Sequence, residues 1–195
     1  MHVIDIGYDD PSFESRASRA LVRERLESIL DGLGQDNVEF SCTFVSDDRI
    51  RELNRQWRGK DESTDILSFV QSDMPDECSD VIWPMGFGET GAELDGDAQY
   101  APDAQGDGDE VEYEDDESVV APDMELDQPR MLGDMVISLD SLKRNADYFS
   151  VSEDEELYRL LIHGVLHLLG EDHATNDPSE PMLQKQEGLL IQLRG

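Results

Sequence analysis

Residues 161–173 have the sequence Leu161-Ile-His-Gly-Val-Leu-His-Leu-Leu-Gly-Glu-Asp-His173, which contains three of the chain's four histidines. His163 and His167 are four residues apart, a spacing that places both imidazoles on one face of a helix, one turn apart. Apolar residues surround them, so we expect the helix to be buried. A glycine such as Gly170 can adopt the left-handed conformation that ends a helix and turns the chain back. The turn can bring His173 next to the imidazoles of His163 and His167.

The spacing of the three histidines matches a metal site. Three neutral imidazoles, with a fourth position left for water, are the usual ligands of a catalytic zinc ion. We therefore predict that His163, His167 and His173 bind one Zn²⁺. Buried histidines without a ligand explain this helix-plus-turn spacing poorly. The same spacing occurs in metzincin peptidases, which place their Glu general base directly after the first His. Gly164 occupies that position here, so the peptidase base is missing.

Composition limits the class of protein. A length of 195 residues is enough for one domain with a hydrophobic core. No segment approaches the roughly 20 consecutive apolar residues of a membrane span. The N-terminal residues contain neither the basic nor the apolar region of a secretory signal. Cys42 and Cys78 belong to no metal or redox motif, as expected of reduced thiols. We expect a cytoplasmic protein with no membrane partner.

Charge is distributed unevenly along the chain. The formal net charge of −32 argues against general nucleic-acid binding, and we expect no DNA partner. Residues 71–130 contain 20 Asp/Glu and one Arg, a net of −19, and the rest of the chain has 27 Asp/Glu and 14 Lys/Arg, a net of −13. From about residue 72 to 128, too few apolar residues are present to offset the entropy of ordering. We therefore expect a disordered acidic insertion there, and any RNA contact must use a local basic patch.

Apolar periodicity predicts an α+β fold. We expect a single domain over residues 1–195, with a small mixed sheet of about four strands, flanked by about five helices and interrupted by the long acidic loop at 72–128. The expected strands are residues 3–6, 38–45, 66–70 and 135–139. The expected helices are residues 12–31 with Ser12 as cap, 48–57 after the capping cluster Ser46-Asp47-Asp48, 140–149 opened by Asp140 or Ser141, a long helix from Ser152 through the histidines, and 178–193 opened by Asp177 and Pro178.

Arg55, Arg58 and Lys60 lie close together in this otherwise acidic chain. A run of charge is commonly only a solvated surface. The spacing of these residues alone leaves a solvated surface and an RNA-binding role equally open.

Three sequence blocks resemble the YbeY family. Residues 163–173 resemble its signature H-G-x-L-H-L-x-G-x-D-H. Residues 53–69 contain Leu-Asn-Arg-Gln-Trp-Arg-Gly-Lys-Asp and Ser-Thr-Asp-Ile-Leu-Ser-Phe, which are similar to the family's L-N-x-x-[WYF]-R-x-K-D-x-x-T-D-V-L-S-F. Residues 132–138 are similar to its L-G-D-I-x-I-[SC]. The resemblance covers nearly the whole chain except about 72–128. Glu171 stands where the family commonly has an aromatic residue, and the family offers no role for the acidic insertion.

The resemblance implies a zinc-dependent endoribonuclease that acts on single-stranded RNA. It implies a role in maturation of the 16S ribosomal RNA 3′ end and in ribosome quality control. The implied partners are precursor rRNA and the small ribosomal subunit with its proteins. The family's zinc ligands correspond to His163, His167 and His173, and its functional arginine corresponds to Arg58.

The chemistry of RNA cleavage suggests roles for these residues. Zinc can polarise a phosphoryl oxygen and lower the pKa of bound water to about 7. The Arg58 guanidinium can bind two phosphate oxygens at once, which a lysine cannot. The general base stays open: the water on the zinc can react directly, or Asp172 or Asp65 can accept its proton. Asp172 can equally orient an imidazole.

Two other classes of function stay open for this chain. A non-catalytic ribosome-assembly factor would use a structural metal and dock on a basic ribosomal protein through the acidic loop. A structural zinc site normally has four protein ligands, however, and the sequence offers three. A metallopeptidase-like hydrolase is disfavoured by Gly164.

Overall fold

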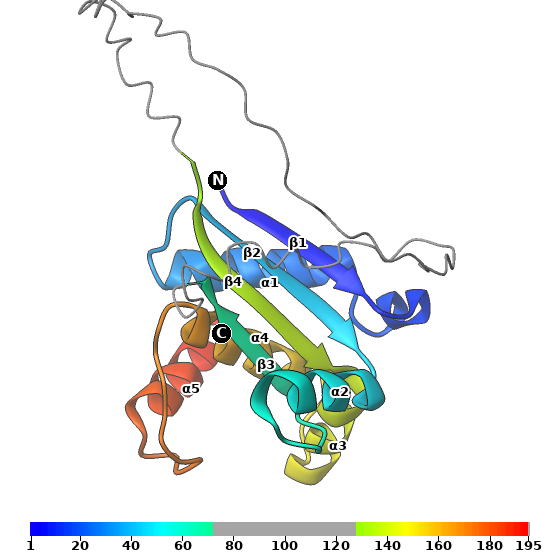
Figure 1. The fold of residues 1–195 in the computed structure, drawn as a ribbon. Helices are drawn as coiled ribbons and strands as arrows, with labels where there is room; N and C mark the ends of the chain where they lie inside the picture. The colour runs from blue at the N-terminus through cyan, green and yellow to red at the C-terminus, as the bar shows by residue number, and fades with distance from the viewer. Residues whose placement is uncertain (72–127, 195) are drawn as a thin grey trace, which may run out of the picture. The chain divides into compact units, whose positions relative to one another are not determined.

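Four strands form one mixed sheet in the computed structural model, which describes residues 1–71 and 128–194 (Figure 1). The order across the sheet is β1-β2-β4-β3. β2 pairs in parallel with β1 and with β4, and β3 is antiparallel to β4. The strands are β1 (Val3–Tyr8), β2 (Val38–Val45), β3 (Ile66–Val70) and β4 (Arg130–Ser138).

Five α-helices accompany the sheet in the described residues, which confirms the predicted α+β class. They are α1 (Arg19–Gly32), α2 (Asp47–Arg58), α3 (Leu139–Phe149), α4 (Glu153–Leu168) and α5 (Pro181–Arg194). Two predicted helix starts are confirmed by their caps, since the Ser46 hydroxyl accepts from the backbone N–H of Arg49 and the Ser152 hydroxyl from that of Glu155.

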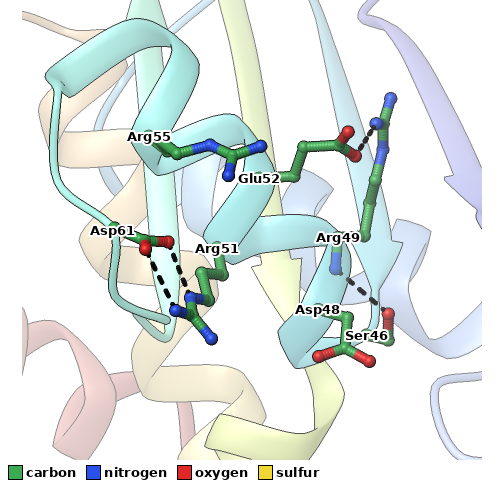
Figure 2. Close-up of a pocket in the computed structure, with 7 residues that line it drawn as sticks. All are labelled: Ser46, Asp48, Arg49, Arg51, Glu52, Arg55 and Asp61. Atoms are coloured by element: carbon green, nitrogen blue, oxygen red, sulfur yellow. Dashed lines mark hydrogen bonds and ion pairs between the residues drawn. The ribbon is translucent and has the colours of Figure 1, made fainter.

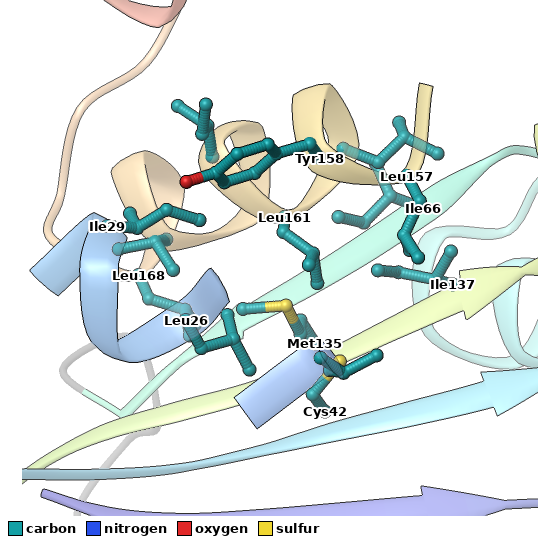
Figure 3. Packing of buried hydrophobic residues seen from close by; sticks show 14 of the residues in the cluster. Leu26, Ile29, Cys42, Ile66, Met135, Ile137, Leu157, Tyr158, Leu161 and Leu168 are labelled. Atoms are coloured by element: carbon teal, nitrogen blue, oxygen red, sulfur yellow. The ribbon is translucent and has the colours of Figure 1, made fainter. Parts of the chain in front are cut away.

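The two faces of the sheet have separate hydrophobic clusters. Side chains alternate between the faces along each strand. Ile66 of β3 and Met135 of β4 belong to the large cluster, where α1, α4 and α5 pack. Figure 3 shows Met135 and Cys42 of the sheet beneath Leu161 of α4. Leu67 belongs to a smaller cluster with Val45, Ile50 and Leu53, so α2 covers the opposite face.

Helix α4 lies close to the sheet at Gly164. This residue is buried, and a Cβ atom built on it would lie 2.9 Å from Ile66 Cδ1 and 3.0 Å from Met135 Sδ. Both distances are shorter than ordinary van der Waals contact, so a larger side chain there would require the Ile66 and Met135 side chains to shift. The close approach explains why glycine follows the first histidine.

The predicted helix over residues 12–31 is divided in two in the structure. A 3-10 helix spans Pro11–Ser15, and α1 begins only at Arg19. Asp10, not Ser12, is the first cap: its side chain accepts from the backbone N–H of Ser12. The division has a tertiary cause, because the Arg16 guanidinium between the two helices donates to the backbone oxygen of Leu139 at 2.9 Å and pairs with Glu153.

Other boundaries also differ from the prediction. β4 begins at Arg130 rather than residue 135, because neighbours on both sides pair with it. Ser138, rather than Asp140 or Ser141, caps α3 by accepting from the backbone N–H of Ser141. α5 begins at Pro181, since Asp177 instead forms a turn in which its carboxylate accepts from Ser179 N.

The predictions on the acidic insertion, the two cysteines and a membrane span concern residues outside and inside the described part of the chain. The acidic insertion at about 72–128 and Cys78 lie outside the described residues, apart from residue 128 itself. Cys42 is fully buried, and burial raises the pKa of its thiol. In residues 1–71 and 128–194, no helix combines the length and hydropathy needed to cross a membrane.

Candidate metal centre

The three predicted histidines converge in the structure. His163 and His167 lie on adjacent turns of α4, and the left-handed Gly170 (φ 87°) follows the helix. His173 comes from the loop beyond it. One ring nitrogen from each histidine lies within 4.8 Å of the others. The predicted convergence is confirmed, and the group has the arrangement needed to hold a metal ion.

Each ring is held by a hydrogen bond from its Nδ1 atom. His163 Nδ1 donates to the side-chain Oε1 of Gln186 at 2.8 Å. His167 Nδ1 donates to the backbone oxygen of Glu171, and His173 Nδ1 to that of Thr175, both at 2.9 Å. Because these oxygens only accept, the hydrogen of each neutral ring is assigned to Nδ1. Each Nε2 therefore presents a lone pair.

The Nε2 atoms fit a cation. His163 Nε2 and His167 Nε2 are 3.0 Å apart, and two facing lone pairs at that distance repel unless a positive charge lies between them. Ligands at about 2.1 Å in a tetrahedral site stand about 3.4 Å apart, so a small adjustment of the rings suffices to bind one ion.

Burial favours the neutral state of two of these rings. Burial lowers the pKa of His163, against the opposing effect of the hydrogen bond that its Nδ1 donates to Gln186. Burial also lowers the pKa of His167, and the neighbouring His163 lowers it further. Metal ions bind the neutral imidazole. Both rings are therefore in the metal-binding state at neutral pH.

Gln186 of α5 supports His163, a role that the sequence analysis missed. Its side chain is buried, and its amide nitrogen donates to Glu187 Oε1 at 3.0 Å. The Arg159 guanidinium holds the same carboxylate oxygen at 2.8 Å. With the amide nitrogen facing Glu187, the amide oxygen faces His163. The one sequence signal was a polar residue between Met182 and Leu189, at an inward position of an apolar helix face.

Replacing Gln186 with Leu is expected to weaken Zn²⁺ binding by about 10- to 100-fold, the usual effect of losing the hydrogen-bond partner of a metal-binding histidine. The His163 ring then loses the acceptor that fixes its orientation. The measurement is the Zn²⁺ dissociation constant from competition with a chelator. Gln184→Leu, at an exposed position of the same helix, is the control and should bind as wild type. Equal affinities of the two variants would contradict the role of Gln186.

Asp65 lies at the start of β3 on the His163 side. Its Oδ2 accepts from Asn145 Nδ2 at 3.0 Å and its Oδ1 from the backbone N–H of Ile66 at 2.9 Å. Its negative charge acts to raise the pKa of His163, against the larger lowering effect of burial. The carboxylate is half-buried and held in one orientation.

Asp172 is largely exposed. Its Oδ1 lies 3.9 Å from His167 Nδ1 and accepts from the backbone N–H of His173 at 2.8 Å. The carboxylate is thus on the Nδ1 side of His167, away from the Nε2 atoms. This position favours the orienting role that the sequence had left open.

Arg58 lies in the last turn of α2 and is exposed. α2 covers the face of the sheet opposite α4, so Arg58 and the histidines belong to opposite faces. Within the described part of the chain, its guanidinium forms no hydrogen bond or ion pair with another residue. The structure therefore places Asp65 at the start of β3, the strand that packs beside α4, but does not bring Arg58 into contact with the histidines.

Comparisons with known proteins agree with the sequence resemblance. The family model described as Endoribonuclease YbeY matches residues 4–194. An Endoribonuclease YbeY of Bacillus cytotoxicus is 37% identical over 171 residues, which cover 87% of this chain and 83% of that protein. One from Persephonella marina is 33% identical over 178 residues, covering 91% and 84%. One from Treponema denticola is 34% identical over 173 residues, covering 89% and 82%.

Proposed function

The chain belongs to the YbeY endoribonuclease family, and we propose that it hydrolyses single-stranded RNA with one Zn²⁺ held by His163, His167 and His173. Family membership supports a nuclease. The observation that carries the metal assignment is the convergence of three Nε2 lone pairs, each fixed by a hydrogen bond from its Nδ1. Three histidines with room for water are typical of catalytic zinc.

The biological substrate that we propose is precursor ribosomal RNA. The protein would act in the cytoplasm, at the 3′ end of 16S rRNA and in ribosome quality control. The small ribosomal subunit and its proteins would be its partners. The three sequence blocks shared with the family support these assignments.

Each residue around the site has a separate role in the proposed hydrolysis. When bound, Zn²⁺ supplies a Lewis acid and a water of lowered pKa. The Arg58 guanidinium, on the face of the sheet opposite the histidines, binds two oxygens of an RNA phosphate beside the cleaved bond. Asp65, near His163 and held by Asn145, accepts the proton of the attacking water. Asp172 helps to orient His167 from its Nδ1 side. An RNA strand passing the β3 edge of the sheet would meet both Arg58 and the metal.

The non-catalytic assembly factor is less well supported. A structural zinc site needs a fourth protein ligand. Among residues 1–71 and 128–194, the histidine cluster has three members and no carboxylate or cysteine joins them. The ligand number supports catalysis.

Arg58→Ala is expected to lower kcat/KM for precursor rRNA by about 10- to 100-fold, because a hydrogen bond to a charged group contributes about 1.5–3 kcal/mol. Arg58→Lys should recover only part of the activity, since lysine lacks the planar fork. Zinc content should be normal in both variants, because Arg58 is not a ligand. RNA cleavage and bound zinc are measured on the same samples.

Arg130→Ala is the matched control, because this exposed arginine lies at the start of β4, where it bonds to Gln35. It should cleave RNA as wild type does. A parallel loss of zinc and activity in Arg58→Ala would mean that Arg58 is structural. Failure of the wild-type, zinc-loaded protein to cleave RNA would overturn the proposed function.

A further inference from the structure

The middle and end of helix α2 carry a local excess of positive charge, although Asp47 and Asp48 begin the helix and Asp61 and Glu62 follow the turn after it. Residues 49–60 contain five of the chain's 15 Lys/Arg and a single acidic residue, Glu52, in a chain whose net charge is −32. Most of such an acidic surface repels RNA, so RNA binding requires a local region of positive charge. The residues of α2 and the following turn provide one.

Three of these arginines form a stripe. Arg51, Arg55 and Arg58 are spaced i, i+4 and i+7, which aligns them on one face of the helix. All three are exposed, whereas Ile50 and Leu53 are buried. Successive members of the stripe are about 4.5–6 Å apart along the helix axis. The stripe therefore runs from Arg58, our proposed phosphate-binding residue, back along α2.

The guanidiniums of the stripe are open to an anion. In the described part of the chain, the guanidinium of neither Arg55 nor Arg58 forms a hydrogen bond or an ion pair. Arg51 pairs with Asp61 through two bonds, at 2.8 and 3.1 Å (Figure 2). Both partners are more than half exposed, and such surface pairs contribute only about 0–1 kcal/mol. A phosphate can therefore replace Asp61 at little cost.

A depression adjoins the stripe. It has a volume of about 540 Å³ and is lined by Arg49, Arg51, Arg55 and the polar residues Ser46, Asp48, Glu52 and Asp61. Figure 2 shows Arg55 and Arg51 on successive turns of α2, with Asp61 on the neighbouring loop. The lining is polar and carries three guanidiniums beside three carboxylates, which suits a solvated backbone better than an apolar ligand.

We propose that Arg51 and Arg55 extend the Arg58 site into a track for the phosphate backbone of single-stranded RNA. Arg58 contacts the phosphate nearest the cleaved bond, and Arg55 and Arg51 contact nucleotides farther from it. Arg55 is thus a binding residue with no part in the chemical step. The inference rests on the proposed RNA hydrolysis and adds a substrate-binding surface to it.

The test is the salt dependence of RNA binding by the zinc-loaded protein. Arg55→Gln should weaken binding of a labelled single-stranded RNA oligonucleotide by about 3- to 10-fold at low salt. The logarithm of the association constant K falls linearly with the logarithm of the salt concentration. Arg55→Gln should make this slope less steep by about 0.7, the value for one phosphate contact on a single strand. KM should rise by the same factor as the dissociation constant, with kcat and zinc content unchanged.

Two further variants make the result specific. Arg130→Gln removes one positive charge at the start of β4, outside α2, and should leave the slope of log K against log salt concentration as in wild type. Asp61→Asn frees Arg51 from its carboxylate and should tighten binding by about 2- to 5-fold with a steeper slope. Arg51→Gln combined with Asp61→Asn should cancel that gain.

The contrary outcomes are distinct. If wild type cleaves RNA and Arg55→Gln has an unchanged slope, the track is wrong and the proposed function stands. If Arg130→Gln has the same effect as Arg55→Gln, only net charge matters and the track is also wrong. A fall in kcat with constant KM would place Arg55 in the chemical step instead. If the wild type neither binds nor cleaves RNA, the proposed function fails together with the track.

Discussion

His167→Ala should reduce RNA cleavage to background and remove most of the bound zinc from the same samples. The variant leaves two imidazoles at a site where three Nε2 atoms converge, one of them 3.0 Å from His167 Nε2. Losing the hydrogen-bond partner of a metal ligand weakens metal binding by about 10- to 100-fold. Losing the ligand itself should weaken it more, so we expect the zinc affinity to fall by at least about 100-fold. Metal analysis and an RNase assay measure the two effects.

His2→Ala is the control, because His2 is the one histidine outside the cluster. It should retain both zinc and activity. Thermal unfolding of His167→Ala, with and without added Zn²⁺, separates loss of the metal from loss of the fold. Cleavage that survived in a zinc-free, folded variant would show that the hydrolysis does not use this site.

Gly164→Glu should destabilise the folded protein by at least about 3 kcal/mol, the range found when an unpaired charge is buried in a packed interior. The new side chain would point at the sheet, where a Cβ alone would lie 2.9 Å from Ile66 Cδ1 and 3.0 Å from Met135 Sδ. Helix α4 would have to move away from β3 and β4. Urea unfolding measures the change in free energy.

Gly188→Glu provides the matched control on α5. A Cβ at that position meets no atom within 4 Å, and the residue is exposed. Since glycine is about 1 kcal/mol less favourable than a good helix former in a helix interior, this variant should be as stable as wild type or more stable. Normal stability of Gly164→Glu would contradict the close packing of α4 on the sheet.

The same packing bears on the peptidase alternative. In metzincins the residue after the first histidine is the catalytic Glu. Here that position faces Ile66 and Met135 of the sheet, so restoring Glu at Gly164 should produce no cleavage of an unfolded protein substrate. Peptidase activity in this variant would revive the alternative. The glycine is therefore explained by helix–sheet packing.

Features determined by neighbouring residues could be predicted from the sequence alone. The metal ligands follow from the period of one helix and from one glycine that permits a left-handed turn, both local properties of the backbone. The caps at Ser46 and Ser152 and the four strands are local in the same way. The division of the 12–31 helix was missed because Arg16 makes its contacts with Leu139 and Glu153, more than 100 residues away.

Only the tertiary structure decided how distant parts of the chain support the site. Gln186 is 23 residues from the ring it holds, and Asp65 reaches the His163 side because β3 is the edge strand beside α4. Arg58 was assigned from a motif, yet packing placed its helix on the other face of the sheet. Spacing along a chain specifies neighbours within one helix or strand. Contacts between elements depend on how their apolar faces are buried together, which no single segment encodes.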